Sequence, residues 1–404
     1  MMLSLLPLKR AFLFKYPVQK PNPPFFNKTH FPLFTPHCSA SHVAMSEEKQ
    51  GHISLQEWQS WGTTSPVPSM VTQIVEDLKD LEKNFDAQMS FGGHGGKLKG
   101  NFGVQEDKKH RATYQSLGDS EEKFKFYSAR QIACRILGSR GYLCQKCWLP
   151  REEDCMCSKV TSCMLWPGIK FWLYMHPKDF LRQNNTGKLL WQVFGVEAAT
   201  LCLYGIPEHE EIMWNSFKLA GKDKIWCLYP NKGSVSKSVE SAFSQEPLAN
   251  YEVTPEKQLT GDTTLHFILL DGTWSNSAAM FCRLQDQAKS VWGDEDLACI
   301  SLNPGASAMH KLRPQPSWDR TCTAAAAVGL LSELQLLPQF SSIDLDKQAE
   351  AIEDALTILL EALTTRRLRM GRSITRKMRP TNSTFSQGKV HNTENEAQHL
   401  PLEI

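Results

Sequence analysis

The sequence lacks any apolar run as long as a membrane span. Its longer apolar stretches, such as residues 324–331, fall well short of the roughly 20 residues that a spanning helix needs, so we expect no membrane partner. An excess of charge is also missing, because 45 Lys and Arg residues face 43 Asp and Glu residues. A nucleic-acid partner would therefore need a local basic patch.

Two catalytic motifs are absent as well. The Gly-rich stretch at 91–103 does not have the G-x-x-x-x-G-K-[ST] spacing of a phosphate-binding loop, and we interpret it as a flexible linker. A zinc protease would need H-E-x-x-H, but Met213 stands where a second histidine would follow His209. These absences argue against nucleotide hydrolysis and zinc-dependent proteolysis.

Acidic residues are missing from the first 46 positions. This segment carries only basic charges, together with many Phe and Pro residues. A basic, acid-free N-terminus is typical of an organelle transit peptide, and we expect a plastid address ahead of a mitochondrial one. The alternative is a disordered extension on a protein of the cytoplasm or nucleus. Both interpretations place residues 1–46 outside the folded domain.

Residues 47–139 are predicted to form an N-terminal extension. Within it, apolar residues recur at helical spacing between 71 and 85, which predicts an amphipathic helix followed by the Gly-rich linker. At the other end of the chain, residues 371–404 are first basic and then polar. We expect this tail to be disordered.

The segment from 164 to 370 alternates between strand-like and helical patterns. Apolar runs stand at 169–175, 199–205, 224–230, 265–271 and 297–302. Continuous apolar strands separated by helices predict an α/β fold with a mostly parallel sheet and helices on both faces. Two long helices are predicted after the strands, at 320–334 and 345–370.

Polar residues follow the first and the fourth predicted strands. His176 ends the first, and an Asn-Thr-Gly stretch comes shortly after it; Asp271 ends the fourth. In open parallel sheets, ligands bind beyond the carboxyl ends of the strands. The residues concerned are His176, Asn185, Thr186, Gly187, Asp271, Gly272, Thr273 and Trp274.

Four cysteines lie close together in the sequence, at Cys144, Cys147, Cys155 and Cys157. The C-x-x-C pair binds a metal from one tight turn, and the C-x-C pair completes a set of four thiolates, which zinc accepts in tetrahedral geometry. We therefore predict a structural zinc module at 140–163. A redox dithiol and a disulfide knot are the alternatives.

Together, the cysteine cluster, the His-Pro that ends the first strand, the Asn-Thr-Gly stretch and the Asp-Gly-Thr-Trp sequence resemble the DTW domain over roughly 140–370. DTW proteins are tRNA-uridine aminocarboxypropyltransferases. The resemblance implies transfer of the 3-amino-3-carboxypropyl group of S-adenosylmethionine to N3 of a uridine in tRNA. It also implies a SPOUT-like catalytic domain at 164–370 with a C-terminal trefoil knot.

Two departures from the family pattern stand out. Lys146 and Leu149 replace the arginines of the family's cysteine motif, which puts RNA contact by that segment in doubt. The family's Ser-Thr-x-Glu-Ala segment is only loosely kept, and its glutamate is missing near Ala325. The altered Ser-Thr-x-Glu-Ala segment leaves an alternative function open: a non-catalytic, zinc-containing RNA-binding protein with a degenerate transferase domain.

With the resemblance, Asp271, Thr273 and Trp274 become the catalytic candidates. Asp271 would accept the N3 proton or orient the base, although a carboxylate there would also suit a helix cap. Trp274 would stack on a nucleobase, or belong to the core. The cofactor-binding candidates are His176, Asn185, Thr186, Gly187, Gly272 and Arg313.

A basic run with no acid ends the last predicted helix. Clustered positive charge holds a phosphate backbone without reading sequence, so we predict that this run binds tRNA. The alternative is a solvated helix end, because cations suit a helix C-terminus. The residues are Arg366, Arg367, Arg369, Arg372, Arg376 and Lys377.

Overall fold

The computed structural model describes residues 52–85, 88–92, 97–229, 236–243, 264–293, 296–303 and 321–374. Several predictions fall outside these ranges: the transit peptide, Arg313, Arg376, Lys377 and most of the tail. The N-terminal extension and the later α/β region belong to one compact unit, Lys49–Ile404.

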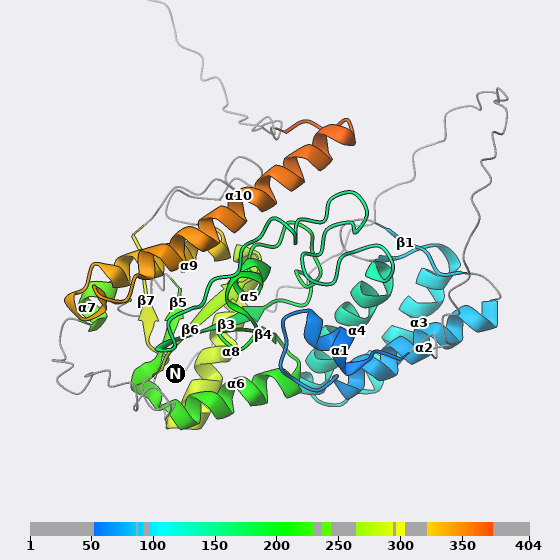
Figure 1. Ribbon diagram of the computed structural model, residues 1–404. Coiled ribbons are helices and arrows are strands. Elements are labelled where there is room, and N and C mark those ends of the chain that lie inside the picture. The colour runs from blue at the N-terminus through cyan, green and yellow to red at the C-terminus, as the bar shows by residue number, and fades with distance from the viewer. Residues whose placement is uncertain are drawn as a thin grey trace, which may run out of the picture. The chain divides into compact units, whose positions relative to one another are not determined.

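A five-stranded parallel sheet forms the centre of this unit (Figure 1). Its strands are β3 (Ile169–Met175), β4 (Ala199–Leu203), β5 (Ile225–Leu228), β6 (Leu265–Asp271) and β7 (Cys299–Ile300). Each strand lies within one of the five apolar runs, so the predicted parallel sheet is confirmed. The strand order is β4-β3-β6-β5-β7. The strands that precede His176 and Asp271 are therefore direct neighbours.

Helices cover both faces of the sheet, as predicted. On one face, α6 (Pro207–Ala220) and α8 (Trp274–Trp292) pack against one set of alternating strand residues. On the other, α5 (Lys188–Phe194), α9 (Thr323–Gln335) and α10 (Leu345–Arg369) pack against the opposite set. Short elements complete the connections: α7 (Val239–Phe243) and the 3-10 turns Lys222–Lys224 and Pro338–Phe340.

The N-terminal extension is mainly helical. It contains α1 (Leu55–Ser60), α2 (Ser69–Phe85), α3 (Gly100–Ser116) and α4 (Ser120–Ser139). The apolar side chains of α2 face the core, which confirms the amphipathic helix. The stretch interpreted as a flexible linker differs from that expectation, because β1 (Phe91–Gly92) pairs with β2 (Lys97–Leu98) and α3 follows at once.

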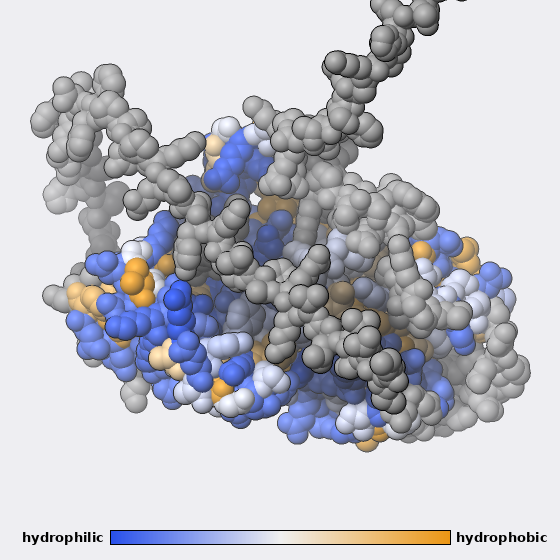
Figure 2. Space-filling view, turned by 180° about the vertical axis from the view of Figure 1, so that it is seen from behind, coloured by the Kyte–Doolittle hydropathy of each residue, from blue (hydrophilic) through white to orange (hydrophobic). Residues whose placement is uncertain are grey.

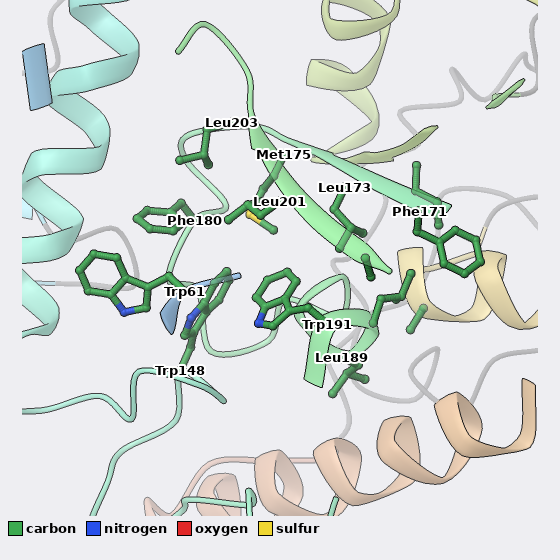
Figure 3. Close-up of a cluster of buried hydrophobic side chains, with 14 of the residues drawn as sticks. Trp61, Trp148, Phe171, Leu173, Met175, Phe180, Leu189, Trp191, Leu201 and Leu203 are labelled. Carbon is green, nitrogen blue, oxygen red and sulfur yellow. The ribbon is translucent and has the colours of Figure 1, made fainter. Parts of the chain in front are cut away.

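Aromatic side chains join the extension to the cysteine module and the sheet (Figure 3). The Trp61 ring lies 5.8 Å from that of Phe180, Phe180 lies 5.6 Å from Trp148, and Trp148 lies 5.3 Å from Trp191. A Cβ on Gly62 would approach the Trp191 ring to 2.6 Å, and the φ of Gly62 is +93°. Only glycine fits this position, which lets the extension pack closely.

Within the described residues, no helix is long and apolar enough to cross a membrane. Figure 2 shows a face on which hydrophilic residues predominate and apolar residues are scattered among them. The trefoil knot implied by the family resemblance stays a prediction, because residues 244–263 and 304–320 lie outside the described ranges.

Candidate functional site

The two polar segments predicted to meet do meet at the carboxyl ends of β3 and β6. The backbone N–H of His176 donates to the carbonyl oxygen of Asp271 at 2.9 Å. The side-chain amide of Asn185 donates to Oδ1 of Asp271 at 2.7 Å. Asn185 is itself oriented, because its Oδ1 accepts from the backbone N–H of Lys188 at 3.1 Å. All four are buried, so the Asp271 carboxylate is held in a defined orientation.

Glycine is required where the Asn-Thr-Gly turn approaches this carboxylate. A Cβ on Gly187 would lie 2.0 Å from Oδ2 of Asp271, a distance that no side chain tolerates. Gly272 is also crowded, because a Cβ there would lie 3.2 Å from the sulfur of Met280 and 3.4 Å from Cβ of His176. The sequence Asp-Gly-Thr-Trp therefore folds tightly against the turn that follows β3.

Asp271 does not cap a helix. It is the last residue of β6, and α8 begins at Trp274 with Thr273 in the N-cap position. Thr273 makes no side-chain cap hydrogen bond, and its hydroxyl lies 2.9 Å from that of Ser275. Trp274 is half-buried and is in neither of the two apolar clusters formed by the described residues.

His176 is neutral in this setting. Its Nδ1 accepts from the backbone N–H of Lys178 at 3.1 Å, which leaves Nε2 to carry the proton. Burial lowers the pKa of His176 to about 4. The ring lies 5.7 Å from that of Tyr204. His176 can therefore donate a hydrogen bond near neutral pH, but it does not supply a positive charge.

Thr186 connects the Asn-Thr-Gly turn to α9. Its hydroxyl oxygen accepts from the backbone N–H of Ala324 at 3.5 Å, and Thr186 is buried. The start of α9 is the region in which the family's missing glutamate would stand. This altered segment thus lies next to the turn that positions Asn185 and Gly187.

Sequence reasoning missed Lys188, which is fully buried directly after Gly187. Its ammonium donates to the carbonyl oxygens of Cys147 and Gln183, the latter at 2.7 Å, and lies 5.7 Å from the centre of the Trp148 ring. Burial lowers the pKa of Lys188 to about 7. The signal in the sequence is a lone cation that opens a mostly apolar helix. Lys188 links the turn to the cysteine module.

The four predicted metal ligands come together in that module. The sulfur atoms of Cys144, Cys147, Cys155 and Cys157 all lie within 4.8 Å of one another, and no other such group of at least three His, Cys, Asp or Glu side chains is found in the described part of the chain. Cys144 and Cys157 are 3.7 Å apart at sulfur, and Cys147 and Cys155 are 3.8 Å apart. Tetrahedral zinc with bonds of about 2.3 Å has sulfur–sulfur edges of about 3.8 Å, so the set fits zinc.

The comparison of this chain with known protein families agrees with the geometry of the site. The family model of the DTW domain matches residues 141–368, which is more than half of the chain. The chain belongs to the DTW domain family. The match includes the cysteine module, the sheet and nearly all of α10, and the resemblance stated above is confirmed. Membership of the DTW domain family supports a transferase that modifies tRNA. No solved structure matches the chain.

The basic run predicted to bind RNA divides into two groups in this DTW protein. Arg366 and Arg369 both contact the buried carboxylate of Asp154, at 3.6 and 2.8 Å, and so attach α10 to the cysteine module. The guanidinium of Arg367 donates to the carbonyl oxygen of Ile374 at 3.4 Å and makes no other hydrogen bond to the described residues. Arg372 is exposed. Two of the predicted RNA contacts therefore have an internal partner.

Proposed function

We propose that this DTW protein transfers the 3-amino-3-carboxypropyl group of S-adenosylmethionine to N3 of a uridine in tRNA. The products are the modified uridine and methylthioadenosine. The observation that carries the proposal is the contact between Asn185 and Asp271, which holds a buried carboxylate at the ligand-binding edge of a parallel sheet. The DTW match over 141–368 supports the reaction class.

The proposed reaction needs a base and a correctly placed electrophile. As uridine N3 bonds to the methylene carbon of the aminocarboxypropyl group that is attached to sulfur, the bond between that carbon and the sulfur breaks. The electron pair of the broken bond stays on sulfur, which becomes the neutral thioether of methylthioadenosine. The N3 proton passes to Asp271, whose carboxylate is held by Asn185. Holding both reactants in place supplies much of the acceleration.

The neighbouring groups take positioning roles in the proposal. Neutral His176 donates from Nε2 to a substrate oxygen. Trp274, half-buried at the start of α8, stacks on a nucleobase. Thr273, Gly272, Thr186 and Gly187 shape the edge of the site, and Arg313 binds an anionic group of cofactor or substrate.

The cysteine module has a structural role in the proposal. Cys144, Cys147, Cys155 and Cys157 would hold zinc, which when bound fixes the fold of residues 140–163. Four thiolates leave no open position for a substrate. The module affects catalysis through Lys188, which follows the Asn185–Gly187 turn and donates from its ammonium to the carbonyl oxygen of Cys147.

The tRNA partner and the location of the protein complete the proposal. Arg367, Arg372, Arg376 and Lys377 contact phosphates, while Arg366 and Arg369 first hold the module in place. The acid-free residues 1–46 direct the chain to an organelle, with the plastid favoured.

A direct assay tests the function. The protein is incubated with unmodified tRNA and with S-adenosylmethionine labelled in the aminocarboxypropyl carbons. We expect labelled tRNA and an equal amount of methylthioadenosine. No transfer to any member of a full tRNA pool would overturn the proposal. The altered segment around Ala325 favours a second candidate, a non-catalytic RNA-binding protein, which would bind tRNA in the same samples without transfer.

A further inference from the structure

The connection between β3 and α5, residues 176–187, carries Asn185 but contains no regular helix or strand. Its backbone is a series of tight turns. The N–H of Asp179 donates to the carbonyl oxygen of His176 at 2.8 Å, and the N–H of Asn185 donates to that of Arg182 at 3.0 Å. Leu181 has a φ of +55°, a conformation that costs about 1–2 kcal/mol for a residue other than glycine. Contacts with the rest of the protein must therefore fix the shape of this connection.

Apolar packing holds only the first half of the connection. Phe180 is fully buried, and its ring lies 6.1 Å from that of Trp58 and 5.6 Å from that of Trp148. Leu181 is buried beside it. The second half, residues 182–187, reads Arg-Gln-Asn-Asn-Thr-Gly and has no large apolar side chain. The position of Asn185 in this half therefore depends on polar contacts.

Gln183 makes two of these polar contacts. Its side-chain oxygen accepts a hydrogen bond from the guanidinium of Arg366 in α10. Its carbonyl oxygen accepts from the ammonium of Lys188 at 2.7 Å. Gln183 is thus held by its side chain and by its backbone, two residues before Asn185. Sequence reasoning assigned no role to Gln183, because a single glutamine in a polar loop carries no recognisable motif.

Arg366 is itself fixed, so Gln183 binds a partner with a defined position. The Arg366 guanidinium also donates to the hydroxyl of Tyr142 at 2.7 Å, and its Nε lies 3.6 Å from the carboxylate of Asp154. The side chain of Arg366 is 15% exposed and that of Asp154 is 2% exposed. A planar guanidinium that contacts several groups at once orients them more strictly than a point charge does. Arg366 therefore joins α10, the cysteine module and the β3–α5 connection.

A chain of contacts leads from α10 to the proposed reacting carboxylate. Arg366 binds Gln183, and Asn185 follows two residues later. The amide of Asn185 donates to Oδ1 of Asp271 at 2.7 Å. We propose that Gln183 is a positioning residue for the transfer, which fixes Asn185, and through it the Asp271 carboxylate, relative to α10. This inference rests on the proposed function. The same helix carries Arg367, so the element proposed to contact tRNA would also orient the base.

Transfer kinetics of full-chain variants at saturating tRNA test this role. Gln183→Met keeps the length of the side chain but removes the oxygen that accepts from Arg366. We expect kcat to fall roughly ten- to hundredfold, as it does when a reacting group is slightly misplaced. The KM for S-adenosylmethionine and the Kd for tRNA should stay within about twofold of wild type, because the contact acts on the reacting step. Gln183→Glu keeps the acceptor oxygen and should retain most of kcat.

Double variants test whether the effect passes through Arg366. Arg366→Met removes the other partner of the contact. The double variant Gln183→Met/Arg366→Met should therefore lose no more of kcat than Arg366→Met alone. Arg369 provides the matched control, because it pairs with the same carboxylate of Asp154 but makes no hydrogen bond to Gln183 among the described residues. The effects of Gln183→Met and Arg369→Met on kcat should simply add.

The outcomes separate the proposed function from the inference about Gln183. No transfer to tRNA by wild type would overturn both. Transfer by wild type, with an unchanged kcat in Gln183→Met, would overturn this inference alone. A loss that Gln183→Glu does not restore, or that comes with an equal rise in KM and a lower melting temperature, would also overturn it, because Gln183 would then only stabilise the fold. Additive losses in Gln183→Met/Arg366→Met would refute the connection to α10.

Discussion

At the scale of single residues, the site depends on the orientation of one carboxylate. Asp271 receives a hydrogen bond from Asn185 on one oxygen and is approached by the backbone of Gly187 near the other. The sequence identified all three residues, because short polar residues after apolar strands are visible in one dimension. It did not reveal Lys188, because the contact of its buried ammonium with the carbonyl oxygen of Cys147 arises only when the cysteine module packs beside the turn.

The first prediction concerns the base. Asp271→Asn keeps the shape of the side chain and the oxygen that accepts from Asn185, but it cannot take a proton. We expect an unchanged melting temperature, unchanged binding of S-adenosylhomocysteine, and a loss of kcat of roughly a hundredfold or more. The loss of activity is measured as the rate of transfer to tRNA in a single turnover. Full activity in this variant would remove Asp271 from catalysis.

The second prediction concerns Gly187. An added methyl group would lie 2.0 Å from Oδ2 of Asp271, so Gly187→Ala must displace the carboxylate or the turn. We expect a stability loss of roughly 1–3 kcal/mol and a loss of kcat. Gly118→Ala is the matched control, because nothing lies within 4 Å of its added Cβ. Urea unfolding and kcat are measured for both variants. Equal behaviour of the two would contradict the close approach.

At the scale of elements, the parallel strands were the most predictable part of the fold. Each is a continuous apolar run, because both faces of the sheet are covered. The order of the strands was not predictable, and that order makes β3 and β6 neighbours. The Gly-rich stretch was harder to predict, since glycines in a linker and glycines beside a short antiparallel strand pair leave the same pattern in a sequence.

The third prediction concerns the cysteine module. We expect one zinc ion per chain by elemental analysis of protein purified without a chelator. Removal of zinc should lower the melting temperature and transfer activity together, because Lys188 joins Cys147 to the site. Restored activity on adding zinc back is the control. Protein that contains no zinc yet melts cooperatively and transfers at full rate would contradict this role.

The fourth prediction concerns the attachment of the extension to α6. His209 accepts from the backbone N–H of Leu203 through Nδ1 and lies 2.8 Å from the hydroxyl of Ser65 through Nε2. Burial lowers the pKa of His209 to about 3. Between pH 6.5 and 3 the unfolded chain therefore binds more protons than the folded chain. Stability must fall as the pH falls through this window, by on the order of 3 kcal/mol at about pH 4.

His209→Gln isolates this effect. Glutamine offers a donor and an acceptor but does not titrate in this range. The midpoint of urea unfolding is measured between about pH 4 and about pH 7 for both proteins. We expect the curve of the variant to be flatter than that of wild type by the amount that His209 contributes. Parallel curves would contradict the assignment.

At the scale of the whole molecule, the folded unit is larger than the DTW match. Trp58 and Trp61 of the extension are buried against Phe180, and Arg283 of α8 binds both Glu121 of α4 and Glu210 of α6. These contacts join segments far apart in sequence. No local pattern predicts them, since burial of a tryptophan or pairing of an arginine depends on what the fold brings alongside.

The fifth prediction concerns the surface for tRNA. Arg367 and Arg372 lie at the end of α10, and no ion pair joins either of them to a carboxylate of the described residues, whereas Arg369 pairs with Asp154 and Glu153. The double variant Arg367→Gln/Arg372→Gln should bind tRNA more weakly than wild type at low salt. The slope of log Kd against log salt concentration should fall by roughly one for each phosphate that is no longer neutralised. The melting temperature should stay unchanged.

Arg369→Gln provides the contrast on the same helix. It removes the ion pair with Asp154, so we expect a lower melting temperature. Any change in tRNA binding should then result from the weaker attachment of the cysteine module to α10. Fluorescence titration with tRNA at several salt concentrations, together with thermal unfolding, separates the two classes. An unchanged salt slope in the double variant would move the RNA surface away from the end of α10. The cations there would then only stabilise the C-terminus of the helix, where positive charge interacts favourably with the helix dipole.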